Sequence, residues 1–260
     1  HERAFEWCKK AADLNHAEAQ RKLGDMYANG QGIKQNMECA REWYEKALQN
    51  GHPLGKKVLQ LIGDQRNKEE VNFDFKFKDF TSVEMKFVMI LLKDRPLKKL
   101  NLGYNGIKDE EARFLSEALR GNTTLQQLDL RSNNIGVEGA KALSEFLRDN
   151  TTLQELDLSS NKIRAEGARF LSEGLRGNTF LQVLGLDWNK IGDEGAKALS
   201  EFLRDNTSLQ HLSLWDNNIG DKGTEALSES LRNNTSLQNL QLGSNKIGIE
   251  GARVLSEFLR

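Results

Sequence analysis

Residues 125–147 have the sequence LQQLDLRSNNIGVEGAKALSEFL, and this stretch decides the fold. Its first half follows the pattern LxxLxLxxNxI, in which the L-x-L leucines alternate as on a short strand with one buried face. Its second half places Ala140, Leu143 and Leu147 at the spacing of an amphipathic helix. We therefore expect a short strand followed by a helix.

The same pattern recurs every 28 residues. Its six copies start at Leu97, Leu125, Leu153, Leu181, Leu209 and Leu237. A repeat at a fixed period predicts a solenoid in which each unit buries its leucines against its neighbours. Strands pack ~4.8 Å apart, whereas a helix with its side chains is ~10 Å wide. We therefore expect a bent stack with parallel strands on the concave face and helices on the convex face.

Three further columns are conserved in position from copy to copy. An asparagine follows each strand, at Asn105, Asn133, Asn161, Asn189, Asn217 and Asn245, and its amide can join the turns of adjacent coils in a ladder. A second asparagine follows the last arginine of each helix, where we expect a C-cap, at Asn122, Asn150, Asn178, Asn206 and Asn234. We expect a glycine column in the turn that leads into each helix, at Gly139, Gly167, Gly195, Gly223 and Gly251.

Large and small side chains alternate four residues apart on successive helices. The pairs are Phe114 with Ala118, Ala142 with Phe146, Phe170 with Gly174, and Ala198 with Phe202. Because each pair keeps a similar volume, the pattern is typical of adjacent layers of one core. It predicts that these phenylalanines are buried.

Residues 97–260 resemble leucine-rich repeats of the ribonuclease-inhibitor type, which also occur in nucleotide-binding innate-immune receptors and in the Ran GTPase-activating protein. The LxxLxLxxNxI pattern carries the resemblance in all six copies. It implies an α/β solenoid, the leucine-rich repeat horseshoe. The cysteine-rich consensus of the vertebrate inhibitor is absent, and every ladder position is asparagine.

A second period of 36 residues occurs upstream, where Ala4, Trp7 and Lys10 recur as Ala40, Trp43 and Lys46. The segment 17–52, AEAQRKLGDMYANGQGIKQNMECAREWYEKALQNGH, resembles a Sel1-like repeat, the shorter relative of the tetratricopeptide hairpin. The resemblance implies an all-α N-terminal region.

We expect four parts along the chain. They are Sel1-like helices over 1–62, a polar connector over 63–70, an N-terminal capping leucine-rich unit over 71–96, and the six repeats over 97–260. In the capping unit, Phe73 and Phe75 align with Leu100 and Leu102 at an offset of 27. The first residue is His1 rather than methionine, so we expect a fragment of a longer chain.

The composition excludes several classes of protein. Lys and Arg total 37 and Asp and Glu total 38, so the basic surplus of a nucleic-acid binder is missing. The longest apolar run, residues 87–92, is far shorter than the ~20 residues of a membrane span. Two isolated cysteines predict a reducing, cytoplasmic setting without a disulfide framework. An alternative location is a host cell, into which the protein would be secreted if it is a bacterial effector.

The sequence lacks the motifs HExxH, GxxxxGK[ST] and GxSxG and has no cysteine–histidine cluster with zinc spacing. We therefore expect no catalytic activity, no cofactor, no metal and no small-molecule substrate. His16 and His52 occupy equivalent positions of the helical repeat, which predicts structural roles.

The residues that flank the inward leucines vary between copies and are expected on the concave face. Two of them, Trp188 and Trp215, are tryptophans in adjacent repeats, and exposed tryptophan is enriched in interface hot spots. We predict a partner-binding patch with its centre at Val183, Asp187, Trp188, His211, Trp215 and Asp216, a polar rim of Asp129, Arg131, Glu155 and Asp157, and a further aromatic at Tyr104. Alternatively, the two rings only cover neighbouring strand ends. Phe180 is a lesser candidate, either as a contact or as extra packing.

These observations predict a non-catalytic protein–protein interaction scaffold or adaptor whose partner binds the concave face. One alternative is a GTPase regulator resembling the Ran GTPase-activating protein, with Arg131 as the active side chain. Others are the targeting arm of a larger signalling or effector protein, and a designed repeat protein. The identical segments 139–151 and 195–207 favour the last of these.

Overall fold

The structure is a computed structural model that describes residues 2–53, 72–76, 84–85, 88 and 96–258. The chain divides into two compact units, one of residues 1–68 with 81–93 and the other of residues 69–80 with 94–260. Each unit is described by itself. The boundaries expected at 62, 70 and 96 stay predictions, and the connector 63–70 lies outside the described residues.

The first unit contains three described helices, α1 (Glu2–Asp13), α2 (Ala17–Asn29) and α3 (Met37–Gln49). His16 begins α2, because its Nδ1 accepts a hydrogen bond from the backbone N–H of Ala19 at 3.3 Å. Gly30 ends this helix at a φ of 67°, which glycine adopts without strain. Buried Leu23 and Tyr44 belong to the apolar interior of the unit. The predicted all-α region is confirmed.

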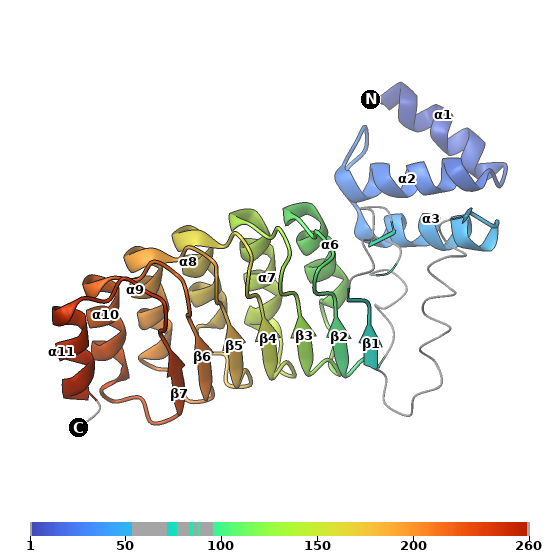
Figure 1. The fold of residues 1–260 in the computed structure, drawn as a ribbon. Coiled ribbons are helices and arrows are strands. Elements are labelled where there is room, and N and C mark those ends of the chain that lie inside the picture. Colours follow the sequence, from blue (N-terminus) through green and yellow to red (C-terminus); the bar gives the residue numbers. More distant parts are fainter. Residues whose placement is uncertain (1, 54–71, 77–83, 86–87, 89–95, 259–260) are drawn as a thin grey trace. The chain divides into compact units, whose positions relative to one another are not determined.

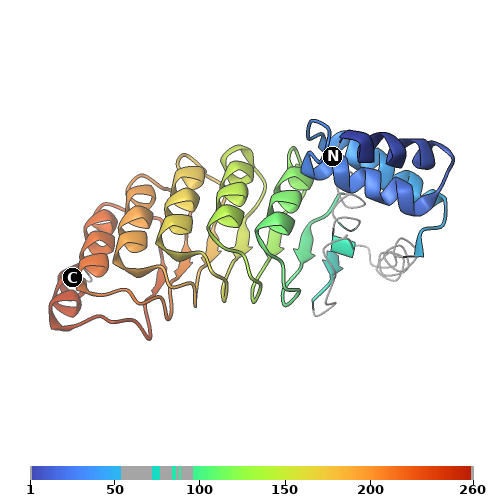
Figure 2. The same cartoon turned by 90° about the horizontal axis from the view of Figure 1, so that it is seen from above.

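The second unit alternates three-residue strands with helices. The strands are β1 (Asn72–Asp74), β2 (Lys99–Asn101), β3 (Gln127–Asp129), β4 (Glu155–Asp157), β5 (Val183–Gly185), β6 (His211–Ser213) and β7 (Asn239–Gln241). The helices are α6 (Asp109–Leu119), α7 (Val137–Asp149), α8 (Arg164–Leu175), α9 (Gly192–Leu203), α10 (Asp221–Leu231) and α11 (Ile249–Phe258). The strands form one parallel sheet in chain order. They run along one face of the unit and the helices along the other (Figures 1 and 2), so the predicted α/β solenoid is confirmed.

The register of the sheet keeps equivalent leucines side by side, as in the pair Leu128 and Leu156. At the first strand, Phe73 pairs with Leu100, the alignment that the 27-residue offset predicts, and Phe75 is fully buried. The side chain of Phe75 thus continues the leucine core to the end of β1. None of the described helices is long and apolar enough to span a membrane.

The predicted asparagine ladder is present, and Asn133 shows how it works. Its Oδ1 accepts hydrogen bonds from the backbone N–H groups of Asn105 at 3.0 Å and Ile107 at 2.9 Å, both in the preceding repeat. Its Nδ2 donates to the carbonyls of Leu102 at 3.1 Å and Leu130 at 2.9 Å. One buried side chain therefore supplies hydrogen-bond partners to backbone N–H and C=O groups in two adjacent repeats. These turn groups have no strand partner of their own.

The second asparagine column forms another ladder, and its prediction as a set of C-caps is wrong. Only Asn150 is a C-cap; arginine takes that position at Arg120, Arg176, Arg204 and Arg232. The Oδ1 of Asn150 instead accepts from the N–H of Leu153 at 2.7 Å, which shapes the start of the next strand. Nδ2 groups then link repeats, as from Asn206 to the carbonyl of Asn178 at 2.9 Å.

The glycine column lies inside the helices rather than in the preceding turns, so that prediction is also wrong. Gly139 is the third residue of α7 and is buried. A Cβ there would stand 2.8 Å from Cγ2 of Ile135 and 3.2 Å from Cβ of Ala112. Glycine is needed because helix and turn approach so closely.

Three of the four predicted core phenylalanines, Phe114, Phe146 and Phe202, are buried. Phe170 is only half-buried, and the guanidinium of Arg169 lies 4.5 Å from its ring centroid. The prediction is wrong for Phe170: this position is also only half-buried at the equivalent alanines of α7 and α9, although the equivalent Phe114 of α6 is buried.

Aspartates at the start of some helices cap the helix of the next repeat. Oδ1 of Asp193 accepts from the N–H of Gly220 at 2.6 Å and of Gly223 at 3.1 Å, and Asp109 and Asp221 do the same one repeat before α7 and α11. Val137 and Ala165 occupy the equivalent position elsewhere. The helices that then lack this cap begin at Arg164 and Gly192, with φ of 61° and 64°.

Candidate partner-binding surface

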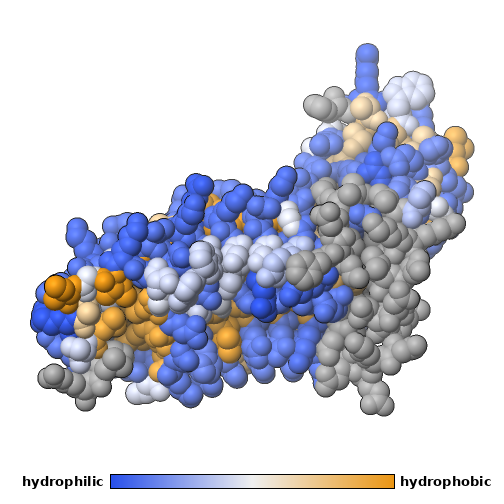
Figure 3. All heavy atoms as spheres, viewed as in Figure 1, coloured by the Kyte–Doolittle hydropathy of each residue, from blue (hydrophilic) through white to orange (hydrophobic). Residues whose placement is uncertain are grey.

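The residues that flank each buried leucine form the exposed surface of the strand face. In β5, Leu184 is fully buried, while Val183 and Gly185 on either side of it are partly exposed. The register places Val183 beside His211 of β6. The predicted columns therefore continue from strand to strand. Hydrophilic side chains cover much of the face seen in Figure 3, and apolar ones gather toward the C-terminal repeats.

Each strand from β2 to β7 is followed by a turn in which one exposed or partly exposed residue has a left-handed backbone. This column comprises Tyr104, Ser132, Ser160, Trp188, Asp216 and Ser244, with φ between 48° and 60°. The conformation turns the chain so that the ladder asparagine, which comes next, points inward. The residue in the column is held outward by a rigid frame, whatever its type.

Trp188 and Trp215 meet on this frame. Their ring centroids lie 4.9 Å apart with the planes tilted by 52°. Trp215 is partly buried because it lies over Gly243 of the next repeat, where any Cβ would collide with its ring. Trp188 keeps 50% of its surface exposed. One ring thus covers a neighbouring strand end and supports the other, which stays open.

Asp187 fixes the position of Trp215. Its Oδ1 accepts hydrogen bonds from the backbone N–H of Trp215 at 2.8 Å and from the hydroxyl of Ser213. In β4, Asp157 serves the equivalent N–H, that of Ser159, within its own repeat at 2.9 Å. Gly185 and Ser213 replace that aspartate in the next two repeats, so Asp187 reaches across instead. Its first role is therefore to position the aromatic pair.

The predicted polar rim forms an internal network. Nε of Arg131 lies 2.8 Å from Oδ2 of Asp129 and 3.3 Å from Oδ2 of Asp157. The hydrogen bond that Arg131 donates to Asp129 raises the pKa of Arg131. Gln127 donates to Glu155 at 2.9 Å. These residues join β3 to β4, and Arg131 is committed to two aspartates.

The structure brings the predicted centre together but separates Tyr104 from it. Tyr104 lies three repeats away from Trp188, with Ser132 and Ser160 at the two intervening positions, and Nζ of Lys76 stands 4.9 Å from the ring centroid of Tyr104. Asp216 occupies, one repeat on, the same turn position as Trp188. The assignment of all these residues to one binding patch stays a prediction.

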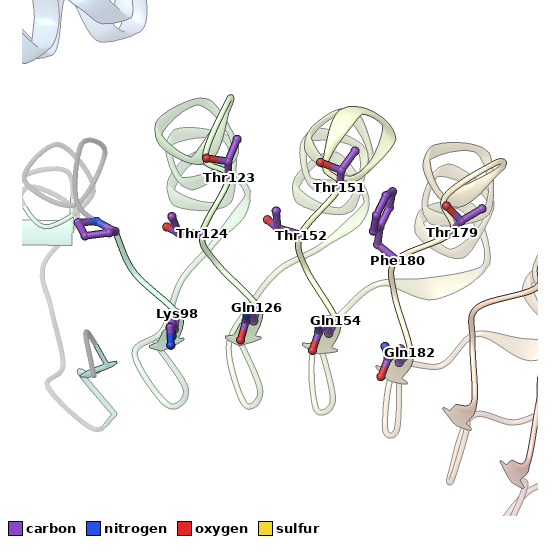
Figure 4. A pocket seen from close by; sticks show the side chains of 11 residues that line it. Lys98, Thr123, Thr124, Gln126, Thr151, Thr152, Gln154, Thr179, Phe180 and Gln182 are labelled. Atoms are coloured by element: carbon purple, nitrogen blue, oxygen red, sulfur yellow. The ribbon is translucent and has the colours of Figure 1, made fainter. Parts of the chain in front are cut away.

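A second surface lies at the opposite ends of the strands. It is a groove of about 460 Å³, lined by Pro96, Lys98, Thr123, Thr124, Gln126, Thr151, Thr152, Gln154, Thr179, Phe180 and Gln182. In Figure 4, Gln126, Gln154 and Gln182 stand side by side, and Phe180 lies between Thr152 and Thr179. Phe180 is 42% exposed. The sequence prediction included Phe180 but not the groove. The signal that could have revealed it is the recurrence of Thr and Gln every 28 residues along its lining.

The helical unit has few reactive groups. Cys8 and Cys39 are free thiols, and burial raises the pKa of Cys8. His52 is buried with its Nε2 2.8 Å from Oε2 of Glu18, in keeping with a structural role. No group of three or more His, Cys, Asp or Glu side chains in the described parts of the chain could hold a metal ion.

Family models divide the chain in the same way. The model for the Leucine Rich repeat matches residues 93–115, 121–144, 149–172, 177–200, 205–228 and 233–256, more than half of the chain. The Sel1 repeat model matches residues 1–16 and 17–52. The chain therefore belongs to the leucine-rich repeat family and carries Sel1 repeats ahead of its leucine-rich repeats.

Three similar proteins are distant or match this chain only over a short segment. The chitin synthase regulator SKT5 of Saccharomyces cerevisiae is 47% identical over 47 residues, which are 18% of this chain and 7% of that protein. Actin-binding site 2 of leiomodin-1 is similar with a TM-score of 0.42 and 19% identity, over 69% of this chain and 88% of that one. The tropomodulin C-terminal domain of Caenorhabditis elegans is similar with a TM-score of 0.46 and 19% identity, over 58% of this chain and 91% of that one.

Proposed function

We propose that this protein is a non-catalytic scaffold whose partner protein binds the strand face around Trp188. The observation that supports the proposal is a half-exposed indole held on a rigid frame. Trp188 leans on Trp215, which Asp187 and Gly243 hold in place. Exposed tryptophan on a fixed support loses little conformational freedom when a partner binds, and it can contribute a large share of the binding free energy.

The surroundings of Trp188 suit a polar interface with an aromatic anchor. His211 and Glu155 are exposed on neighbouring strands, and Val183 adds apolar surface between them. A ring of such residues excludes water from a central contact without contributing much itself.

The alternative function as a GTPase regulator has less support. It requires Arg131 to reach a bound nucleotide. Arg131 would first have to leave both Asp129 and Asp157. A GTP-hydrolysis assay over a panel of small GTPases, with Arg131→Ala as the control, tests this activity directly.

The test of the scaffold proposal compares two serine variants at opposite ends of β5. Trp188→Ser should fold normally, because serine occupies the same turn position as Ser132, Ser160 and Ser244 at a similar φ. Phe180→Ser removes a ring of similar exposure from the groove and is the matched control. Affinity capture with mass spectrometry should lose a partner only with Trp188→Ser. A partner that survives Trp188→Ser and is lost with Phe180→Ser would move the function to the groove.

A further inference from the structure

Several partly exposed aromatic rings of this protein lie under a cation of their own chain. Nζ of Lys10 lies 4.9 Å from the ring centroid of Trp7, Lys46 lies 4.0 Å from Trp43, and Lys76 lies 4.9 Å from Tyr104. Trp188 differs, since no Lys or Arg of the described residues stands over it. Its open indole face is available to a cation from outside, and tryptophan is the ring that attracts cations most strongly.

The strand face near this open ring carries an excess of carboxylates, of which Asp157 is already paired with Arg131. The outward positions of β4 to β7 and of their turns contain four carboxylates and neither lysine nor arginine; the acids are Glu155, Asp157, Asp187 and Asp216. Asp187 precedes Trp188 in the chain, and Asp216 occupies the equivalent turn of the next repeat. Lys162 and Lys190 directly follow the ladder asparagines Asn161 and Asn189, and neither stands over the ring.

The carboxylates also have acceptor capacity left. Asp187 uses Oδ1 for Trp215 and Ser213, while its Oδ2 makes no hydrogen bond to the part of the chain that the structure describes. Asp216 makes no side-chain hydrogen bond or ion pair within the same part. An indole face beside carboxylate oxygens suits a guanidinium, which can stack on the ring and donate to the acid in one plane.

We propose that Trp188, with Asp187 and Asp216 beside it, binds an arginine or lysine side chain on an exposed polypeptide segment of the partner. The inference rests on the proposed function, because it names the chemistry of the partner at the same surface. Arginine is preferred to lysine, since an ammonium group can satisfy the carboxylates but cannot stack. The interaction is polar and partly exposed, so it weakens with added salt.

The test is selection from a random dodecapeptide library on the full chain, repeated on Trp188→Ser and Asp216→Ser. Both variants place in the turn the serine that three other repeats already carry there, and circular dichroism checks that each is folded. Enriched peptides should share an arginine or lysine. Binding of a selected peptide should weaken about tenfold in either variant, and also when citrulline replaces its arginine.

Three other results would overturn the inference, and they separate it from the scaffold proposal. Peptides that need Trp188 but share no basic residue would refute the cationic partner and leave the strand-face site standing. Peptides that bind Trp188→Ser as well as wild type would count against both. A library without enrichment would show that no linear basic segment is bound, whereas the scaffold proposal would still be decided by capture of folded proteins.

Discussion

Replacing the ladder residue Asn133 by alanine should destabilise the leucine-rich unit strongly. The change leaves the N–H groups of Asn105 and Ile107 without their buried acceptor. It also removes one hydrogen bond from each of the carbonyls of Leu102 and Leu130, which keep the bonds donated by Asn105 and Asn161. Each unsatisfied buried polar group costs about 1–3 kcal/mol. Since the carbonyls have second lone pairs and partial alternatives, the two N–H groups dominate, and we expect a loss of about 3–5 kcal/mol in the free energy of unfolding.

The adjacent residue provides a matched control. Asn134 has the same side chain but is exposed, so Asn134→Ala should change stability by less than about 0.5 kcal/mol. Urea unfolding followed by far-ultraviolet circular dichroism measures the difference. Hydrogen exchange should also show faster exchange at the amides of Asn105 and Ile107 in Asn133→Ala alone. A difference between the two variants of less than about 1 kcal/mol would refute the reasoning that the ladder stabilises the stack.

Three further predictions concern packing, capping and pH. Asp193→Ala removes the cap from α10 and should lower stability by about 1–2 kcal/mol in chemical unfolding; no change would mean that water replaces the carboxylate. Gly174→Ala should cost about 1–3 kcal/mol, because its Cβ would collide with the backbone of Ser144, and a neutral result would show that the helices move apart freely. Hydrogen bonds, chiefly from Arg21, lower the pKa of Glu18 from 4.5 to about 2. Its stabilising effect is therefore complete above about pH 4.5 and is lost toward pH 2, so the small Tm deficit of Glu18→Gln near neutral pH should vanish in acid.

The repeat period made most of the fold predictable from the sequence. The leucine register and the first asparagine ladder follow from a residue type that recurs in one position, because neighbours in a solenoid are fixed by the period. The second asparagine column was equally visible, but its role depends on where each helix stops. Arg204 ends α9 before Asn206, which leaves the asparagine to join repeats at the start of the next strand.

The candidate site was predictable in composition but not in the roles of its residues. Sequence variation in the outward columns identified Trp188 and Trp215. The hydrogen bond from Trp215 to Asp187 crosses between repeats and replaces one that an aspartate usually makes within a single repeat. Likewise, the pairing of Arg131 with two aspartates depends on side-chain direction on adjacent strands. These pairings depend on how side chains of adjacent repeats are oriented in space, so the sequence pattern alone does not predict them.

Photo-crosslinking at position 188 tests the central claim most directly. p-Benzoylphenylalanine in place of Trp188 keeps an aromatic group at the open turn position of β5, and the same residue in place of Phe180 samples the groove at the other end of that strand. Irradiation in cells should join a partner protein to the chain at position 188 and not at position 180. Adducts at position 180 with none at position 188 would contradict the account.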